Sequence, residues 1–64
     1  MIEKMKVGSR IITFDGKIGT IMEFYNKYKN DNGETIIEGI EVEFDDEAPI
    51  TRAIDIKDVK ELIE

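Results

Sequence analysis

Sixty-four residues can form one domain at most, near the size at which a single core only just outweighs chain entropy, so no catalytic domain fits beside a regulatory one. The chain contains no Cys and no His, which excludes disulfides, thiol nucleophiles, zinc sites built on either residue and the usual proton shuttle near neutral pH. Its 15 acidic and 9 basic residues give a net charge of −6, which argues against a broad basic surface for nucleic acid.

Turn-forming residues recur at short intervals, a spacing typical of short strands rather than helices. The first strand is predicted at residues 10–14, which are rich in β-branched side chains and end at Asp15-Gly16, a pair that tolerates the positive φ of tight turns. The second strand is expected from residue 18 to about residue 25. Its imperfect alternation of apolar and polar residues predicts a bulge or sharp bend near Gly19. Residues 26–34 are then expected to be a polar loop, with Asn32-Gly33 as its turn.

The third strand has the clearest pattern, because Ile40, Val42 and Phe44 alternate with acidic residues as in a half-buried antiparallel strand. Residues 35–38 keep strand-forming chemistry, but Gly39 is expected to break the register. A fourth strand is predicted at residues 50–56, after a turn at residues 45–49. Pro49 fits only at the start of this strand, where no hydrogen-bond donor of the ladder is lost.

The C-terminal segment allows two interpretations. We prefer one 3₁₀ turn over residues 56–58 followed by a short closing strand at residues 60–63, because a fifth strand would cover an exposed edge. A terminal helix is the alternative, since the spacing of Ile56, Val59, Leu62 and Ile63 also suits a helical face.

Two stretches resemble KOW and bacterial Tudor-like modules, in which a Gly-Asp-x-Val stretch leads through a turn to Gly-x-Val. In "VGSRIITFDGKIGTIMEF", residues 7–24, the first part corresponds to Gly8, Ser9 and Ile11, and the second to residues 19–21. Residues 42–63 look like the closing half, in which a hydrophobic strand ends in Phe-Asp-Asp before the last hairpin. The resemblance implies a non-enzymatic recognition module, because similar modules of transcription elongation factors and repair helicases bind RNA polymerase, RNA or DNA.

We therefore expect a single all-β domain over residues 1–64, a small five-stranded SH3-like barrel with a short 3₁₀ turn before the last strand. Its core is expected to draw on nine apolar residues: Val7, Ile11, Ile21, Ile40, Val42, Phe44, Ile54, Val59 and Leu62.

A run of carboxylates forms the first candidate site, for a protein partner: Glu41, Glu43, Asp45, Asp46 and Glu47. Alternation places the first three on one outer strand face at intervals of about 7 Å. Such a ladder of negative charge suits a basic protein, or imitates a phosphate backbone toward a nuclease or polymerase. The expected partner is RNA polymerase or another nucleic-acid enzyme. The simpler interpretation is a solvated strand face that ends in an acidic turn.

The alternative is direct binding of RNA or DNA through interleaved aromatic and basic residues, which stack bases and hold phosphates. The residues for this surface are Lys6, Arg10, Lys17, Tyr25, Lys27, Tyr28 and Lys29. They fall in the basic part of the chain, since residues 1–29 hold six bases and three acids, whereas residues 30–64 hold three bases and twelve acids. Here too a simpler interpretation exists, in which Phe24 and one tyrosine are core and the lysines solvate a hairpin tip.

Catalysis and metal binding have no motif in this chain. "DNGE" lacks the ligand series of a calcium-binding loop, and adjacent carboxylates in an open turn bind magnesium only weakly. We expect no enzyme activity and no cofactor. No apolar segment approaches the roughly twenty residues of a membrane span, so we expect a cytoplasmic protein without membrane contact, either a monomer or a weak homodimer. The small size also suits a protein of a virus or mobile element that acts on host machinery.

Overall fold

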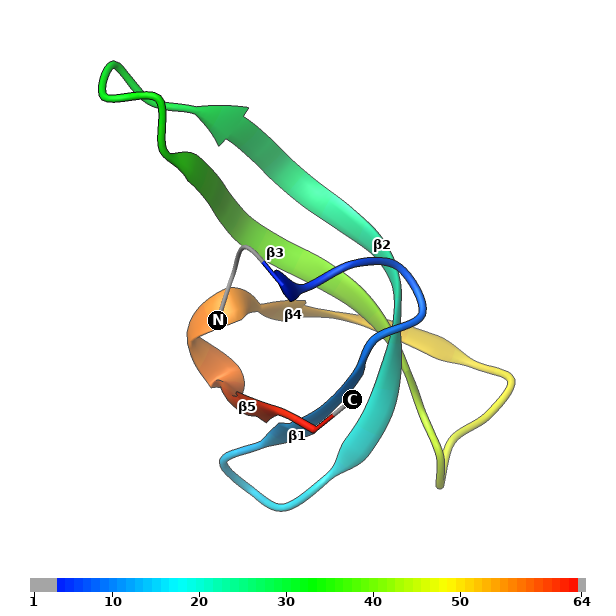
Figure 1. Cartoon of the computed structure of the whole chain (residues 1–64). Helices are drawn as coiled ribbons and strands as arrows, with labels where there is room; N and C mark the ends of the chain where they lie inside the picture. The colour runs from blue at the N-terminus through cyan, green and yellow to red at the C-terminus, as the bar shows by residue number, and fades with distance from the viewer. Residues whose placement is uncertain (1–3, 64) are drawn as a thin grey trace.

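The computed structural model describes residues 4–63 as one antiparallel sheet of five strands with a 3₁₀ turn before the last strand, as predicted (Figure 1). The helix that the C-terminal spacing also allowed does not form. The elements in chain order are β1 (Arg10–Thr13), β2 (Ile18–Lys29), β3 (Thr35–Phe44), β4 (Thr51–Asp55), the 3₁₀ turn η2 (Ile56–Asp58) and β5 (Val59–Leu62).

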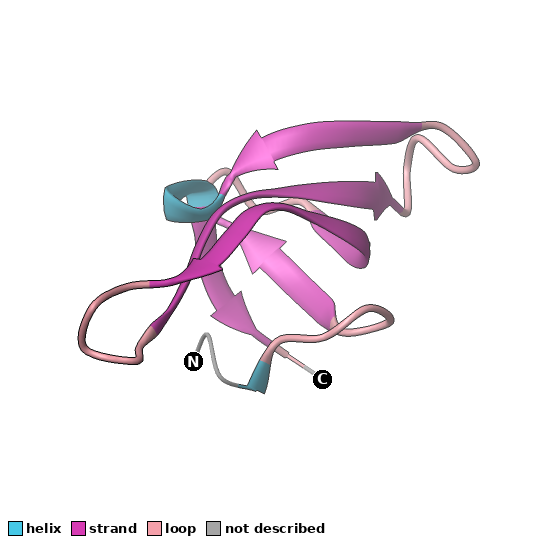
Figure 2. Cartoon of the chain, turned by 90° about the horizontal axis from the view of Figure 1, so that it is seen from above, coloured by secondary structure: helices cyan, strands magenta, loops and turns pink. Residues whose placement is uncertain are grey.

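The sheet is not closed into a barrel. Its strand order is β4-β3-β2-β1-β5, so β4 and β5 lie at the two ends of the sheet and do not pair with each other. The turn η2 joins these two end strands, and Figure 2 shows it at one side of the curved sheet. Asp55 starts this turn by accepting a hydrogen bond from the backbone N–H of Lys57, 3.0 Å from its Oδ1. The expected barrel closure is therefore not found, and an open seam remains between β4 and β5.

The hairpin of β2 and β3 extends beyond the rest of the sheet as a two-stranded arm (Figure 1). The polar loop expected at residues 26–34 is wrong for residues 26–29, because Lys27, Tyr28 and Lys29 pair with residues 35–37 of β3. Only the tip is a turn. Asn30 closes it by accepting hydrogen bonds on Oδ1 from the backbone N–H groups of Asn32 (3.0 Å) and of residue 34 (2.9 Å).

The bulge in β2 lies beyond the position that the sequence indicated. Ile21 pairs with Val42, but the next paired residue of β2 is Glu23, so Met22 is the extra residue. Gly19 has a different role, since a Cβ atom there would lie 2.5 Å from Val42 Cγ1. The expected break at Gly39 is also wrong, because β3 continues through it without a change of register.

The core follows the β3 pattern that the sequence predicted. Ile11, Ile21, Ile40 and Val42 are completely buried, and each contributes about 1.5–3 kcal/mol of burial energy. Phe44 and Val59 are buried as expected, whereas Ile54 and Leu62 are only partly buried against the cluster. Val7 is wrong as a core residue, since 60% of it is exposed in the turn before β1. Two apolar residues that the sequence analysis did not assign complete the core, Met5 and Ile37.

Candidate functional site

The C-terminal half of the acidic run is neutralised by cations from β1, from the β1–β2 turn and from β4. Arg10, on β1, forms a bidentate ion pair with Asp45, in which Nη1 donates to Oδ1 at 2.7 Å and Nη2 donates to Oδ2 at 2.6 Å. Nη1 also donates to Thr20 Oγ1 at 2.9 Å. The hydrogen bonds from Arg10 lower the pKa of Asp45 below its ordinary value. Asp45 is therefore held as a carboxylate whose charge is compensated by its neighbour.

Glu47 and Asp46 are compensated in the same way. Glu47 Oε2 accepts a hydrogen bond from Lys17 Nζ at 2.6 Å and another from Arg52 Nη2 at 2.5 Å. Asp46 Oδ2 lies 3.7 Å from the same Lys17 Nζ. The hydrogen bond between Lys17 and Glu47 lowers the pKa of Glu47 and raises that of Lys17. These contacts fasten the β3–β4 turn to the β1–β2 turn, which carries Lys17, and to β4, which carries Arg52. The β3–β4 turn is therefore a structural ion cluster rather than an unpaired acidic patch.

Among the described residues, three further carboxylates lie close together on the sheet without an ion-pair partner, Glu23, Glu41 and Glu43, which we call the outer acidic face. Glu41 and Glu43 share one face of β3, as the sequence predicted, and Glu23 of β2 pairs directly opposite Glu41. Within residues 4–63, none of the three forms an ion pair. Thr20 and Thr51 pair with Glu43 from either side, so neither residue directly opposite Glu43 is a cation.

Sequence reasoning missed Glu23 because its face depends on the bulge. Ile21 points into the core, and two residues further along a regular strand Glu23 would point the same way. The extra residue Met22 shifts the alternation by one position and moves Glu23 to the face of Glu41. The irregular alternation of residues 18–25 was the available indication, although it did not locate the bulge.

Tyr25 belongs to the same face. Its hydroxyl donates to the Glu41 carboxylate, at 2.9 Å from Oε1 and 2.8 Å from Oε2. This hydrogen bond, followed by partial burial and the charges of Glu41 and Glu23, raises the pKa of Tyr25. Tyr25 thus orients one carboxylate of the outer acidic face and places a half-exposed aromatic ring beside it.

The residues expected for nucleic-acid binding are not brought together. Arg10 and Lys17 hold the acidic turn, as described above. On the arm, Lys27 Nζ lies over the ring of Phe24, 5.2 Å from its centroid. Strand alternation puts Tyr28 on the face opposite Lys27 and Lys29. Lys6 lies in the turn before β1, where its carbonyl accepts the N–H of Ser9.

The described residues were compared with the requirements of a metal site and of a membrane-spanning helix. Among residues 4–63, no three acidic side chains converge in a way that could hold a metal ion. No helix in that part of the chain has the length and apolar character that crossing a bilayer requires. Comparisons with protein-family models, with curated proteins and with solved structures find no match to the chain.

Proposed function

We propose that the protein is a non-catalytic binding module whose outer acidic face docks onto a basic surface of a partner protein. The observation that supports this most directly is the pairing of Glu23 with Glu41. Like charges directly opposite each other on adjacent strands destabilise a sheet by about 0.2–1 kcal/mol. A Lys or Arg from a partner would turn this unfavourable contact into a favourable one.

The composition of the face suits reversible protein recognition. Three carboxylates without cationic partners attract a basic surface and speed its encounter, and Tyr25 adds an aromatic ring with a polar tip. Because Tyr25 already holds Glu41 by a hydrogen bond, part of the face is ordered before the partner arrives.

The fold supports a more specific proposal about the class of module. The strand order β4-β3-β2-β1-β5, with a 3₁₀ turn between the end strands, suits an SH3-like barrel whose seam stays open. The resemblance of residues 7–24 and 42–63 to KOW and bacterial Tudor-like modules then favours a partner from transcription or nucleic-acid processing, such as RNA polymerase. On this proposal the protein is an adaptor or inhibitor that acts in the cytoplasm.

Direct nucleic-acid binding is the weaker candidate. Two of its cations, Arg10 and Lys17, would first have to leave Asp45 and Glu47. The exposed arm residues Lys27, Tyr28 and Lys29 remain available, so the experiment must distinguish the two modes.

The proposal is tested by affinity capture from nuclease-treated lysate, comparing the wild-type protein with the double variant Glu23→Gln, Glu41→Gln. The double variant should lose the captured protein and keep a stability within about 1 kcal/mol of wild type, because the repulsion that is removed offsets the weaker hydrogen bond from Tyr25 to residue 41. Loss of binding at nearly unchanged stability would separate a docking role from a structural one.

A matched control carries the same change of charge elsewhere, in Glu38→Gln with Glu61→Gln, both at exposed positions. This control should retain the partner. Equal loss in both variants would mean that only net charge matters, and retention in both would refute the outer acidic face as the docking site. If capture instead disappears with nuclease and with Lys27→Glu, Lys29→Glu, the nucleic-acid mode is correct.

A further inference from the structure

The strand β4 lies at one end of the sheet and pairs with a neighbour on one side only. Its residues pair with residues 39–43 of β3, and in the part of the chain that the structure describes no strand pairs with its outer edge. Such an edge presents a row of unpaired backbone N–H and C=O groups, which is a template for a further strand. Four of the five residues of β4 are exposed, so the edge is open to solvent.

The hydrogen-bond pattern of β3 identifies which backbone groups of β4 point outward. Just past the end of β3, the N–H of Asp45 donates to a carbonyl of β2 at 3.0 Å. Because the backbone groups of successive residues alternate in direction, the even-numbered residues of β3 bond toward β4. Their partners Arg52 and Ile54 are therefore bonded to β3. The N–H and C=O groups of Thr51 and Ala53 then point away from the sheet, along the free edge.

The edge of β4 lacks the features that commonly protect an exposed strand, which are bulges, proline and lysine. It pairs with β3 in unbroken register over five positions and contains no Lys or Pro. At the other end of the sheet, β5 carries Lys60 and pairs with β1 across a register shift. The edge of the arm in β2 is interrupted at Asn26, whose φ is 53°. Of these three edges, that of β4 is the best suited to receive a strand.

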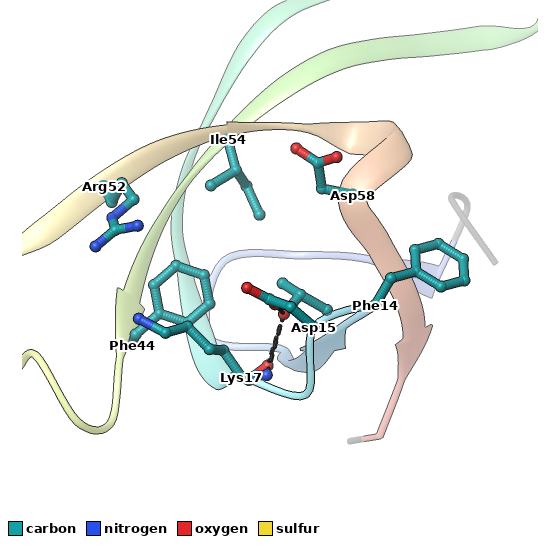
Figure 3. A pocket seen from close by; sticks show the side chains of 8 residues that line it. Phe14, Asp15, Lys17, Phe44, Arg52, Ile54 and Asp58 are labelled. Atoms are coloured by element: carbon teal, nitrogen blue, oxygen red, sulfur yellow. Dashed lines mark hydrogen bonds between the residues drawn. The ribbon is translucent and has the colours of Figure 1, made fainter.

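The side chains of β4 divide between the two faces of the sheet. Arg52 and Ile54 line a pocket on the inner face (Figure 3). Ala53 lies between them in the strand and so points to the opposite face, where it pairs with Glu41 of the outer acidic face. A residue added opposite Ala53 would therefore project its side chain onto the side of the sheet that carries the three carboxylates.

Small side chains separate this edge from the carboxylates. Neighbouring strands lie about 4.8 Å apart, so a residue opposite Ala53 would have its Cα about 10 Å from that of Glu41. A lysine or arginine side chain laid across Ala53 covers most of this distance, and the side chain of Glu41 covers the rest. Thr51 lies beside Glu43 in the same arrangement, two positions along the strand. Basic residues at alternate positions of an added strand would thus meet both carboxylates.

We propose that β4 receives, by antiparallel strand addition, an extended segment of the partner protein with basic residues at alternate positions. The inference rests on the proposed function, because these cations bind the outer acidic face. It adds that backbone hydrogen bonds hold the segment and that the alternate side chains select it. Antiparallel pairing is the slightly stronger of the two directions. A second copy of the chain is a poor occupant, since two paired β4 edges would place two outer acidic faces side by side.

The test is a hydrogen-exchange NMR titration of the whole protein with the capped peptide acetyl-Arg-Val-Arg-Val-Arg-amide. The amides of Thr51 and Ala53 should exchange rapidly in the free protein and at least about tenfold more slowly at saturation, because the peptide accepts their hydrogen bonds. The amides of Arg52 and Ile54 are internal controls, since they already bond to β3 and should exchange slowly in both states. The peptide acetyl-Glu-Val-Glu-Val-Glu-amide should not bind.

Methylation of the peptide backbone tests the added ladder without any change to the protein. In an antiparallel pair, the N–H of the central arginine bonds to Ala53, whereas the valine N–H groups point to solvent. A methyl group on the central arginine nitrogen should weaken binding about tenfold. A methyl group on a valine nitrogen should have little effect. The two modified peptides have the same charge, so the difference between them reports strand addition alone.

Two variants at the centre of the edge test the same bonds from the protein side. Ala53→Pro removes the outward N–H and should weaken the arginine peptide about tenfold. Proline is tolerated on edge strands where the N–H faces solvent, and circular dichroism would check that the fold is retained. The matched control Ala53→Ser keeps the N–H and a small side chain and should bind as wild type does. If Ala53→Pro does not fold, the methylated peptides decide the question alone.

The outcomes separate this inference from the proposed function. Equal binding of the two methylated peptides, or binding without slower exchange of Thr51 and Ala53, would exclude strand addition. The outer acidic face would then still be the docking site if Glu23→Gln, Glu41→Gln weakens the peptide. Binding of wild-type strength by this double variant would refute the outer acidic face and the basic partner. Slower exchange at high protein concentration without peptide would show that a second copy occupies the edge, which would overturn the proposal.

Discussion

Gly19 of β2 has no room for a Cβ atom, and replacing it with alanine should be strongly destabilising. The added Cβ would lie 2.5 Å from Val42 Cγ1, 2.9 Å from Glu43 O and 3.1 Å from Phe44 Cα. Favourable contacts between such atoms need about 3.5 Å or more. Two of the three atoms belong to the backbone of β3, which cannot retreat without lengthening the ladder. We therefore expect a loss of about 2–3 kcal/mol, in the upper part of the range for overpacked cores.

A loss of this size matters in a protein of 64 residues, whose total stability should be about 3–10 kcal/mol. The melting temperature should fall by about 10–20 °C, measured by circular dichroism, with urea unfolding as a check. Gly39→Ala is the matched control on the neighbouring strand, since its Cβ would lie at ordinary contact distances of 3.4 Å and 3.6 Å from its nearest neighbours. That variant should be neutral or stabilising by about 0.4–1 kcal/mol. Gly19→Ala at wild-type stability, or an equal loss in both variants, would refute the close-approach argument.

Three further results are expected from the core and the polar contacts. Ile40→Ala should cost about 2–5 kcal/mol because Ile40 is completely buried, whereas Val7→Ala should leave urea unfolding nearly unchanged because Val7 is exposed. The pKa of Asp45 is lowered by Arg10, so the pair stabilises the fold fully above the ordinary Asp pKa of about 4 and loses this contribution as the pH falls through the folded-state pKa. Arg10→Gln should therefore raise the pKa of Asp45 in a carboxyl NMR titration. An unchanged pKa would contradict the assignment. Glu41→Gln should lower the pKa of Tyr25 toward its ordinary value, followed by the Tyr25 ring signals at alkaline pH, and no change would exclude the charged hydrogen bond.

Local chemistry was sufficient to predict the strands and less reliable for their ends. The β-branched run of β1 and the alternation around Ile40 identify strands because a strand buries every second residue. The arm was missed because residues 26–29 are polar and their strand conformation comes from pairing with β3, which is a tertiary effect. The core role of Ile37 was missed for a related reason, since its burial comes from tertiary packing in the same cluster as Met5.

The site was harder to predict than the fold because its properties are set by contacts distant in sequence. The acidic run was visible, but nothing local shows that Arg10 and Lys17 would neutralise Asp45 and Glu47, which lie 35 and 30 positions away. These contacts combine residues that the sequence assigned to two rival sites. The remaining negative charge therefore had to be located from the register of β2 against β3.

The hairpin tip at residues 30–34 has a practical consequence for dividing the protein. It separates a strand-forming part of net positive charge from one of net negative charge, and the arm carries it away from the body of the sheet (Figure 1). If the chain were cut before Asn30, the two resulting peptides would attract each other because of their opposite net charges. Their assembly would re-form both the β2–β3 ladder and the Arg10–Asp45 pair. Because the attraction acts through solvent before contact, salt would slow reassembly. The chain is thus suited to serve as a two-piece tag, in which each half pairs with the other half rather than with a second copy of itself.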